Sequence, residues 1–297
     1  MNKTYKIAGL GEVLWDVHGD DFTFGGAPGN CACHCNSLGA KAYTISCIGD
    51  DQLGVKAKAF LDQHGINTTG LAISSEFETG IVNIELDFAG KPEYHIIENV
   101  AWDNIPFTEE MAAIAPELDA VCFGSLAQRN STSRKTIETF LKATSEGCVK
   151  LFDINIRLNY YTEEIIKSSL MLANALKIND EELPLLANIL ALTGTNEEQM
   201  LAILDICDLK LVILTCGSEG ALMMTRDDKS FAKPEKIDSI ASTVGAGDSY
   251  TATALMGYLQ GKKLETINKH ANAVAGYVCT QTGAVPQLPE KLIKGEL

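Results

Sequence analysis

The residues best suited to chemistry form a turn at positions 242–248, with the sequence S-T-V-G-A-G-D, that leads into a helix-period segment. Gly245, Ala246 and Gly247 carry almost no side chain, so backbone N–H groups at the helix start can approach an anion, assisted by the helix dipole. A carboxylate there would repel phosphate unless it had another task, and accepting a proton from an attacking hydroxyl fits Asp248. The turn therefore predicts phosphoryl transfer with Asp248 as base; simple helix capping by Asp248 is the alternative.

A second cluster of small residues lies near the N-terminus, where Gly25 and Gly26 begin the run G-G-A-P-G-N that ends at Asn30. Paired glycines let a polyhydroxylated ligand approach the backbone, and the Asn30 amide can both donate and accept hydrogen bonds. Asp16, upstream of this run, is a further candidate for binding sugar hydroxyls. An ordinary turn held by Asn30 is the alternative, and a helical segment that ends at Gly39 follows.

Positioning these residues requires regular elements, and the chain alternates short apolar runs with helix-period segments. The runs expected to be buried strands are 7–10, 42–48, 120–123, 149–154, 175–178 and 211–214. The helices expected between or after them include 53–64, 131–145 and 250–260. This alternation predicts an α/β fold with a mostly parallel sheet, and the length of 297 residues allows one large domain or two small ones.

One segment departs from this alternation, because Val82, Ile84, Leu86 and Phe88 alternate with polar residues before a turn at 89–92. Such a pattern is typical of a half-buried antiparallel hairpin. We expect the segment at about 79–98 to form a small separate sheet with residues 13–24, acting as a lid over a site and as the contact surface of a homodimer. An edge hairpin of the main sheet is the alternative.

Composition excludes several classes of protein. Lys and Arg total 24 against 39 Asp and Glu, a formal net charge of −15, and no basic stripe offers itself to nucleic acid. Nine cysteines and a start without an apolar signal segment favour a reducing compartment, so we expect a cytoplasmic protein. No run approaches the ~20 apolar residues of a membrane span. The C-x-C-H-C run at 31–35 spreads around a helix axis, so we expect small core residues there and no zinc site.

The two glycine clusters resemble the paired signatures of the ribokinase-like, or PfkB, carbohydrate kinases. Other landmarks follow in that family's order, so the resemblance spans nearly the whole chain. They are the first strand with Asp16, the turn at 48–54, the N-x-x-E element of Asn179 and Glu182, and the T-x-G-x-x-G loop from Thr215 to Gly220. The resemblance implies a single domain over 1–297 with a three-layer α/β/α core, a β-sheet lid, and in-line transfer of the ATP γ-phosphoryl group to a sugar.

The resemblance also implies a role for each site residue. The substrate-binding residues would be Asp16, Gly25, Gly26, Asn30 and Arg157. The ATP-binding residues would be Asn179, Glu182, Thr215, Gly217, Gly220 and Asn272, and the catalytic ones Asp248 with the N–H groups of Gly245, Ala246 and Gly247. Glu182 would contact Mg²⁺ through water. Ser242 stands where the family often has an Asp that supports a monovalent-cation site, which argues against potassium activation.

The stretches 152–161 and 98–103 resemble fructokinases, which makes fructose the expected substrate. A 2-keto-3-deoxygluconate kinase or another sugar kinase is the alternative, and Arg157 could bind a carboxylate, a phosphate or the sugar. A non-catalytic sugar or nucleotide sensor on the same fold is an alternative of another class. A nicotinamide-dependent oxidoreductase ranks last, because Gly9-Leu10-Gly11 is not followed by a glycine-led helix.

Overall fold

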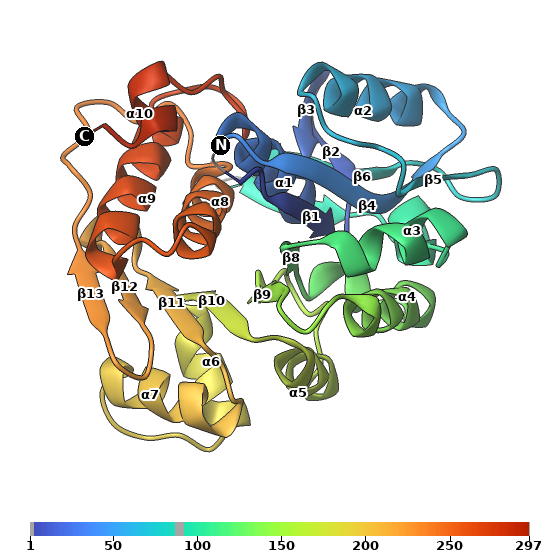
Figure 1. The fold of residues 1–297 in the computed structure, drawn as a ribbon. Helices are drawn as coiled ribbons and strands as arrows, with labels where there is room; N and C mark the ends of the chain where they lie inside the picture. The colour runs from blue at the N-terminus through green and yellow to red at the C-terminus, as the bar shows by residue number, and fades with distance from the viewer. Residues whose placement is uncertain (1–2, 87–91, 297) are drawn as a thin grey trace.

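A nine-stranded sheet runs through the middle of the chain in the computed structural model, which describes residues 3–86 and 92–296 (Figure 1). Its strand order is β13-β12-β11-β10-β9-β8-β1-β4-β5. The strands are β1 (Lys6–Leu10), β4 (Lys41–Gly49), β5 (Leu71–Ser74), β8 (Ala120–Phe123), β9 (Val149–Asp153), β10 (Ala175–Asn179), β11 (Leu211–Thr215), β12 (Ala221–Met224) and β13 (Lys229–Ala232). Within this order, the strands β11, β10, β9, β8, β1, β4 and β5 are parallel to one another. The strands β12 and β13 extend the sheet antiparallel beyond β11.

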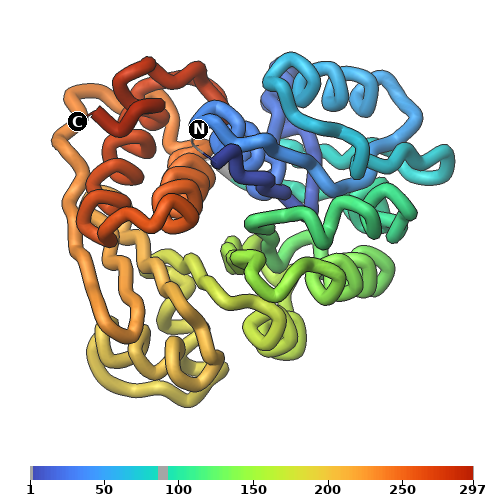
Figure 2. Tube along the Cα trace, in the orientation of Figure 1, coloured from blue at the N-terminus to red at the C-terminus, as the bar shows by residue number. Residues whose placement is uncertain are grey.

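Helices cover both faces of this sheet, which confirms the predicted three layers (Figures 1 and 2). One face carries α1 (Ala27–Ser37), α2 (Gln52–Gln63), α8 (Ala246–Leu259), α9 (Leu264–Cys279) and α10 (Glu290–Lys294). The other carries α3 (Glu109–Ile114), α4 (Ser131–Ala143), α5 (Glu163–Leu172), α6 (Glu182–Ile189) and α7 (Asn196–Ile206). Among the helices of the described residues, none is long and apolar enough to cross a bilayer.

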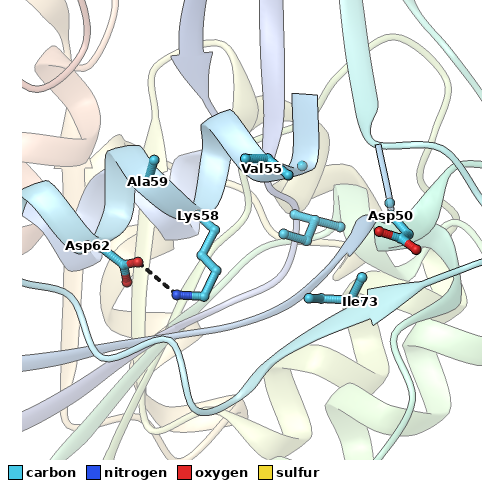
Figure 3. Close-up of a pocket in the computed structure, with 9 residues that line it drawn as sticks. Asp50, Val55, Lys58, Ala59, Asp62 and Ile73 are labelled. Carbon is cyan, nitrogen blue, oxygen red and sulfur yellow. Dashed lines mark hydrogen bonds and ion pairs between the residues drawn. The ribbon is translucent and has the colours of Figure 1, made fainter. Parts of the chain in front are cut away.

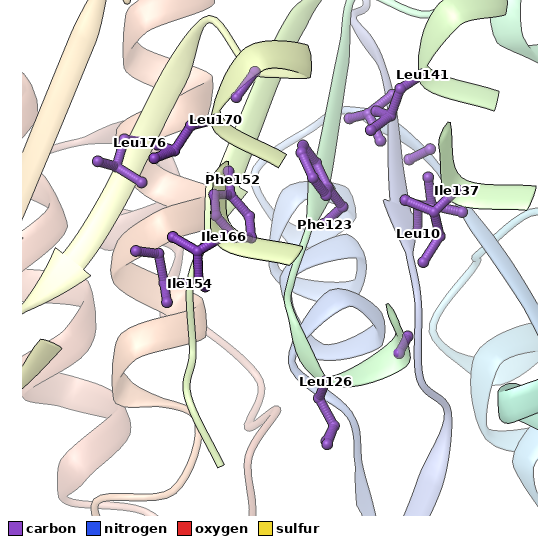
Figure 4. Close-up of a cluster of buried hydrophobic side chains, with 14 of the residues drawn as sticks. Leu10, Phe123, Leu126, Ile137, Leu141, Phe152, Ile154, Ile166, Leu170 and Leu176 are labelled. Carbon is purple, nitrogen blue, oxygen red and sulfur yellow. The ribbon is translucent and has the colours of Figure 1, made fainter. Parts of the chain in front are cut away.

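Each face of the sheet buries its own hydrophobic core, because successive strand residues point to opposite sides. On β8, Val121 and Phe123 pack into the core beneath α4 and α5, while Ala120 and Cys122 pack into the core beneath α1 and α8. Phe123 stacks on Phe152 of β9 with ring centroids 5.1 Å apart (Figure 4). Strands buried on both faces in this way read as continuous apolar runs in the sequence.

A separate four-stranded sheet, the small sheet, has the order β3-β2-β6-β7. Its strands are β2 (Leu14–His18), β3 (Asp21–Gly25), β6 (Gly80–Leu86) and β7 (Pro92–Ile96). The predicted hairpin thus pairs with the N-terminal segment as expected and is not an edge of the main sheet. The turn predicted at its tip, with Phe88, lies outside the described residues.

The small sheet is anchored to the core through Asp51, the residue before α2. The Asp51 carboxylate accepts hydrogen bonds from the Gly54 N–H at 2.7 Å and from the Thr79 N–H at 2.7 Å. Thr79 immediately precedes β6, and its hydroxyl accepts a bond from the Gly49 N–H at the end of β4 at 2.9 Å. One carboxylate therefore caps α2 and fixes the point where the chain enters the small sheet.

Candidate active site

The predicted site residues gather at the carboxyl ends of the central parallel strands, where ligands of open α/β sheets usually bind. Asn179 ends β10 and Thr215 ends β11, and the two are direct partners in the parallel register. Asp16 lies on β2 of the small sheet, and Asp248 lies in the first turn of α8. The structure thus brings segments from both ends of the chain to one edge of the main sheet.

The start of α8 depends on a glycine at position 245. Gly245 is the N-cap residue with φ of 80°, in the left-handed region, and a Cβ there would lie 2.2 Å from the Ala284 carbonyl oxygen. That carbonyl is held by the Nε2 of His34 in α1 at 2.9 Å. Burial lowers the pKa of His34 to about 4, so a neutral ring donates this bond. His34 is therefore a buried residue that holds the Ala284 carbonyl in place.

The first turn of α8 presents unbonded N–H groups. The first hydrogen bond back along the helix runs from the Ser249 N–H to the Gly245 carbonyl at 2.9 Å, and Ala246 donates to Thr243 at 3.3 Å. Within the described part of the chain, the N–H groups of Gly247 and Asp248 have no acceptor. We call these groups the nest, since they can receive an anion at the positive end of the helix dipole.

Asp248 lies beside the nest and is partly buried. Its Oδ2 accepts a hydrogen bond from Asn30 Nδ2 at 2.8 Å, which joins α8 to α1 across 218 residues of sequence. Burial raises the pKa of Asp248 to about 6, although the Asn30 bond and the charges of Lys177 and Arg157 oppose that rise. Such a carboxylate is ionised at neutral pH and is more basic than an ordinary aspartate, as a general base requires.

The residues predicted to bind sugar lie on or next to the small sheet, with Asp16 on β2, Gly25 at the end of β3 and Asn30 in the first turns of α1. A Cβ on Gly25 would lie 2.7 Å from Asp16 Oδ2, so glycine makes room for this carboxylate. Gly26 has φ of 106°, and a Cβ there would lie 2.3 Å from the Glu12 carbonyl oxygen. Burial raises the pKa of Asp16 to about 6. Both glycines are therefore required by close contacts, while Asn30 directs its amide N–H to Asp248.

Arg157 supplies positive charge to this group of acids. It lies in the loop after β9, an exposed position flanked by Asn155 and Leu158 with positive φ angles of 46° and 50°. Its charge lowers the pKa of Asp16 and Asp248 against the effect of their burial. In the described residues it has no ion-pair partner within 4.0 Å, so its guanidinium remains available to a ligand.

Glu12 is a further acid of this group that sequence reasoning did not assign to the site. It is 2% exposed, its Oε2 has no hydrogen-bond partner among the described residues, and burial raises its pKa to about 7. The Arg157 charge lowers that pKa and the Asp248 charge raises it, which places Glu12 in the same electrostatic cluster. The one signal for Glu12 in the sequence was an acid two residues after a predicted buried strand.

A cavity of about 510 Å³ opens on the other side of the α8 start. It is lined by four residues predicted to bind ATP, which are Thr215, Gly217, Gly220 and Asn272. Ala246 and Gly247 of the α8 start also line it, and Ile237, Ile240 and Tyr250 give it apolar walls. The cavity thus joins an apolar surface that suits a nucleotide base to the nest that suits a phosphate.

Asn179 and Glu182 form a reciprocal pair at the start of α6. Asn179 Oδ1 accepts from the Glu182 N–H at 2.8 Å, and Glu182 Oε2 accepts from the Asn179 N–H at 2.9 Å. Glu182 Oε1 also accepts from the Ile156 N–H at 2.9 Å, and the side chain is buried. Glu182 is therefore a buried carboxylate held by backbone N–H groups at the start of α6.

The oxygens around Glu182 determine whether Mg²⁺ fits at the start of α6. In the described residues no three Asp, Glu, His or Cys side chains converge as a metal-binding group. Both oxygens of Glu182 already accept one backbone N–H, which leaves further lone pairs free for water. The residues thus fit a hydrated Mg²⁺ held mainly by nucleotide phosphates, with Glu182 reaching it through water.

A second hollow of about 270 Å³ lies between α2 and β5, away from these residues (Figure 3). Val55 and Ile73 contribute exposed apolar side chains to it, and a hydrogen bond of 2.7 Å joins Lys58 to Asp62 on its wall. None of the predicted site residues lines it.

Comparison with known proteins gives a consistent result. Residues 2–291 match the family described as pfkB family carbohydrate kinase. Sugar kinase PH1459 of Pyrococcus horikoshii is 29% identical over 304 residues, which cover 96% of this chain and 93% of that protein. Fructokinase-2 of Zea mays is 26% identical over 279 residues, which cover 89% of this chain and 82% of that protein.

Solved structures share the fold over the full length. The structure of the Pyrococcus horikoshii sugar kinase in complex with ATP has a TM-score of 0.83 at 26% identity and covers 99% of this chain and 100% of its own. The structure of a fructokinase with bound ATP from Xylella fastidiosa has a TM-score of 0.86 at 18% identity, with 99% and 98% covered. The second likeness bears on the fold alone.

Proposed function

This chain belongs to the pfkB family of carbohydrate kinases and is an ATP-dependent sugar kinase, and from this premise we propose that its acceptor is fructose, with Asp248 as the general base. The observation that carries the assignment of Asp248 is its position. The carboxylate lies beside the nest and is held by Asn30, between the cavity on one side and the Asp16 group on the other.

The proposed reaction is an in-line transfer. A sugar hydroxyl beside Asp248 gives its proton to the carboxylate as its oxygen forms a bond to the γ-phosphorus of ATP. The bond between that phosphorus and the bridging oxygen breaks, and ADP leaves with the electron pair. The N–H groups of Gly247 and Asp248, with those of Gly245 and Ala246 beside them, stabilise charge on the transferred group. Mg²⁺ bound with ATP would neutralise phosphate charge, and Glu182 would hold it through water.

The remaining predicted residues divide between the two substrates. Asp16, Gly25, Gly26 and Asn30 would form the sugar subsite, with Arg157 near a hydroxyl or an acidic group of the sugar. Thr215, Gly217, Gly220, Asn179 and Asn272 would bind ATP around the cavity of about 510 Å³. The fructokinase relatives support fructose, and a keto-deoxy sugar acid is the competing acceptor.

The small sheet is proposed as a lid over the sugar subsite and as a dimer contact, because Asp16 belongs to it and apolar side chains remain exposed on it. We also propose a cytoplasmic location, which the nine unpaired cysteines support.

The acceptor is tested with a panel of ketoses, aldoses, keto-deoxy acids and nucleosides, each mixed with Mg-ATP while ADP release is measured. We expect fructose to give the highest kcat/KM, with a margin of about tenfold over the next acceptor. Asp248→Asn serves as the matched control, since it keeps the shape of the side chain; its kcat should fall by about 10²–10⁴. A keto-deoxy acid preferred over fructose would replace the assigned acceptor, and normal turnover by Asp248→Asn would remove the assigned base.

A further inference from the structure

Lys177 is a buried cation on strand β10 of the main sheet. It lies on β10 directly opposite Asp153 of β9 in the parallel register. Its Nζ is 3.0 Å from Asp153 Oδ1, and the two side chains are 8% and 6% exposed. The other carboxylate oxygen of Asp153 accepts from Thr251 Oγ1 of α8 at 3.1 Å. The ion pair is therefore tied to the helix that carries Asp248.

Stability does not account for this pair. Removing two charges from water costs free energy that their attraction seldom exceeds, and apolar residues of similar volume often serve as well or better. The neighbours of Lys177 along β10, Leu176 and Ile178, are fully buried apolar side chains. The position of this charged pair next to the start of α8 explains it better.

The nest at Gly247 and Asp248 lies next to the Lys177 ammonium group. Gly247 has an ordinary φ, so its lack of a side chain is not required by the backbone. A Cβ at this position would have one heavy atom within 4 Å, Lys177 Nζ at 3.7 Å. Glycine at 247 therefore keeps the space between the nest and the ammonium group open. Asp153 holds the ammonium group on one side at 3.0 Å, and Lys177 Nζ is the one side-chain atom of the described residues within 4 Å of a Cβ placed on Gly247.

We propose that the Lys177 ammonium group stabilises the negative charge of the γ-phosphoryl group during transfer, with Asp153 and Thr251 holding it in place. The proposal rests on the function proposed above. Phosphoryl transfer is catalysed mainly by alignment and by fixed positive charge near the transferred oxygens. Arg157 also carries charge in this site, but on an exposed loop, whereas Lys177 is fixed by its burial and by Asp153. Lys177 is thus the preorganised cation of the site.

The direct test replaces Lys177 by Gln and by Arg. We expect Lys177→Gln to lower kcat by about 10²–10³ and Lys177→Arg to lose less, because Arg keeps the charge. The matched control is Lys150→Gln, because Lys150 lies near the start of β9 whereas Asp153 ends that strand. Its kcat should stay within about threefold of wild type. A folded Lys177→Gln protein with kcat within about threefold of wild type would overturn the proposal.

Lys177→Gln alone leaves the Asp153 carboxylate buried without its partner, which could prevent folding. The double variant Lys177→Gln with Asp153→Asn removes both charges and keeps both shapes, so it separates folding from catalysis. Its far-ultraviolet circular dichroism and melting temperature should match wild type, and its kcat should still fall by about 10². Wild-type kcat in this double variant would show that the pair has no catalytic task.

A pH profile shows whether the charges of Lys177 and Asp153 act on Asp248 in the working enzyme. The charged groups that act on Asp248 are Asp153, Lys177, Arg157 and Glu12, and Asn30 donates to it. Loss of the Lys177 charge raises the pKa of Asp248, so the acid limb of kcat/KM moves to higher pH. Loss of the Asp153 charge in Asp153→Asn moves that limb to lower pH. Limbs that stay in place or move together would contradict the proposal.

Nucleotide affinity distinguishes failure of this inference from failure of the proposed function. Calorimetric titration without sugar should give a roughly tenfold weaker affinity for Mg-ATP in Lys177→Gln, with the affinity for Mg-ADP changed by less than about threefold. If wild type phosphorylates no acceptor, the proposed function fails while this titration still tests Lys177. Unchanged Mg-ATP affinity in that case would overturn the inference.

Discussion

Three carboxyl groups with raised pKa values surround one exposed arginine in this site. Burial raises the pKa to about 7 for Glu12, to about 6 for Asp16 and to about 6 for Asp248. Arg157 opposes each of these rises. Acids in such a group influence one another, so their protons are lost as a coupled set. Such a group changes protonation state just below neutral pH, which would suit the general base proposed for Asp248.

This clustering predicts how activity depends on pH. Asp248 must be ionised to accept the proton, and its pKa is raised to about 6, so kcat/KM should fall as pH decreases through about 6. An unperturbed aspartate would sustain activity to about pH 4. The measurement is initial rate against pH at low fructose, with the sample returned to neutral pH to confirm that the loss is reversible. Constant kcat/KM down to about pH 5 would show that the group that accepts the proton does not have a raised pKa.

Sequence reasoning identified candidate residues in the glycine-rich turns, at the ends of β10 and β11, and at Asp16 of β2, and it did not identify Lys177 of β10 or Asp153 of β9. Asp248 stands out because an acid beside three small residues is unusual at an anion-binding turn. Lys177 and Asp153 do not stand out, because their pairing depends on the register of β9 and β10. Their one signal was a charged residue within an apolar run that predicts a buried strand.

At the scale of elements, the start of α8 depends on the close approach of the 282–284 segment to Gly245. Gly245→Ala should place a Cβ 2.2 Å from the Ala284 carbonyl oxygen in addition to forcing a left-handed alanine. Gly261→Ala is the matched control, since Gly261 has φ of 66° with no atom within 4 Å of a Cβ. The control should lower the melting temperature by about 2–4 °C.

Gly245→Ala should lower the melting temperature by about twice as much as the control and reduce kcat by more than about tenfold, because displacement of α8 moves Asp248. Thermal unfolding and ADP release measure the two effects. Equal melting temperatures for the two variants, with full activity in Gly245→Ala, would show that the contact does not constrain the helix start.

The predicted elements agree with the structure where the hydrophobic period was strong. The run at 120–123 matches β8, and the helix expected at 250–260 begins earlier, at Ala246, since the capping glycine and not the apolar period sets its start. The antiparallel strands β12 and β13 were not predicted. Lys229–Ala232 alternates exposed and buried residues over only four positions, which is too short for a clear period.

At the scale of the whole molecule, the small sheet predicts a homodimer. Residues opposite each other in the β6 and β7 register share a face, so Tyr94 and Ile84 lie on the same face as Val82, which pairs with Asp16 of β2. Tyr94 is 46% exposed there. Val82 is already buried in the core, so a second copy of the sheet would bury Tyr94 and the exposed part of Ile84.

Tyr94→Asp should therefore shift the protein toward monomer in light scattering at micromolar concentration, because it places a charge in the proposed contact. His95→Asp is the matched control, since the adjacent residue on β7 points to the opposite face and is exposed. A wild-type protein that is strictly monomeric, or a dimer that both variants leave intact, would contradict the proposed contact.

The central claim is that the γ-phosphoryl group of ATP is transferred to a hydroxyl of fructose. Phosphorus nuclear magnetic resonance of the protein with Mg-ATP and fructose follows that group directly. We expect a phosphomonoester signal on the sugar that grows in step with ADP, and no such signal with Asp248→Asn over the same time. Release of ADP with inorganic phosphate alone, or no consumption of ATP, would contradict it.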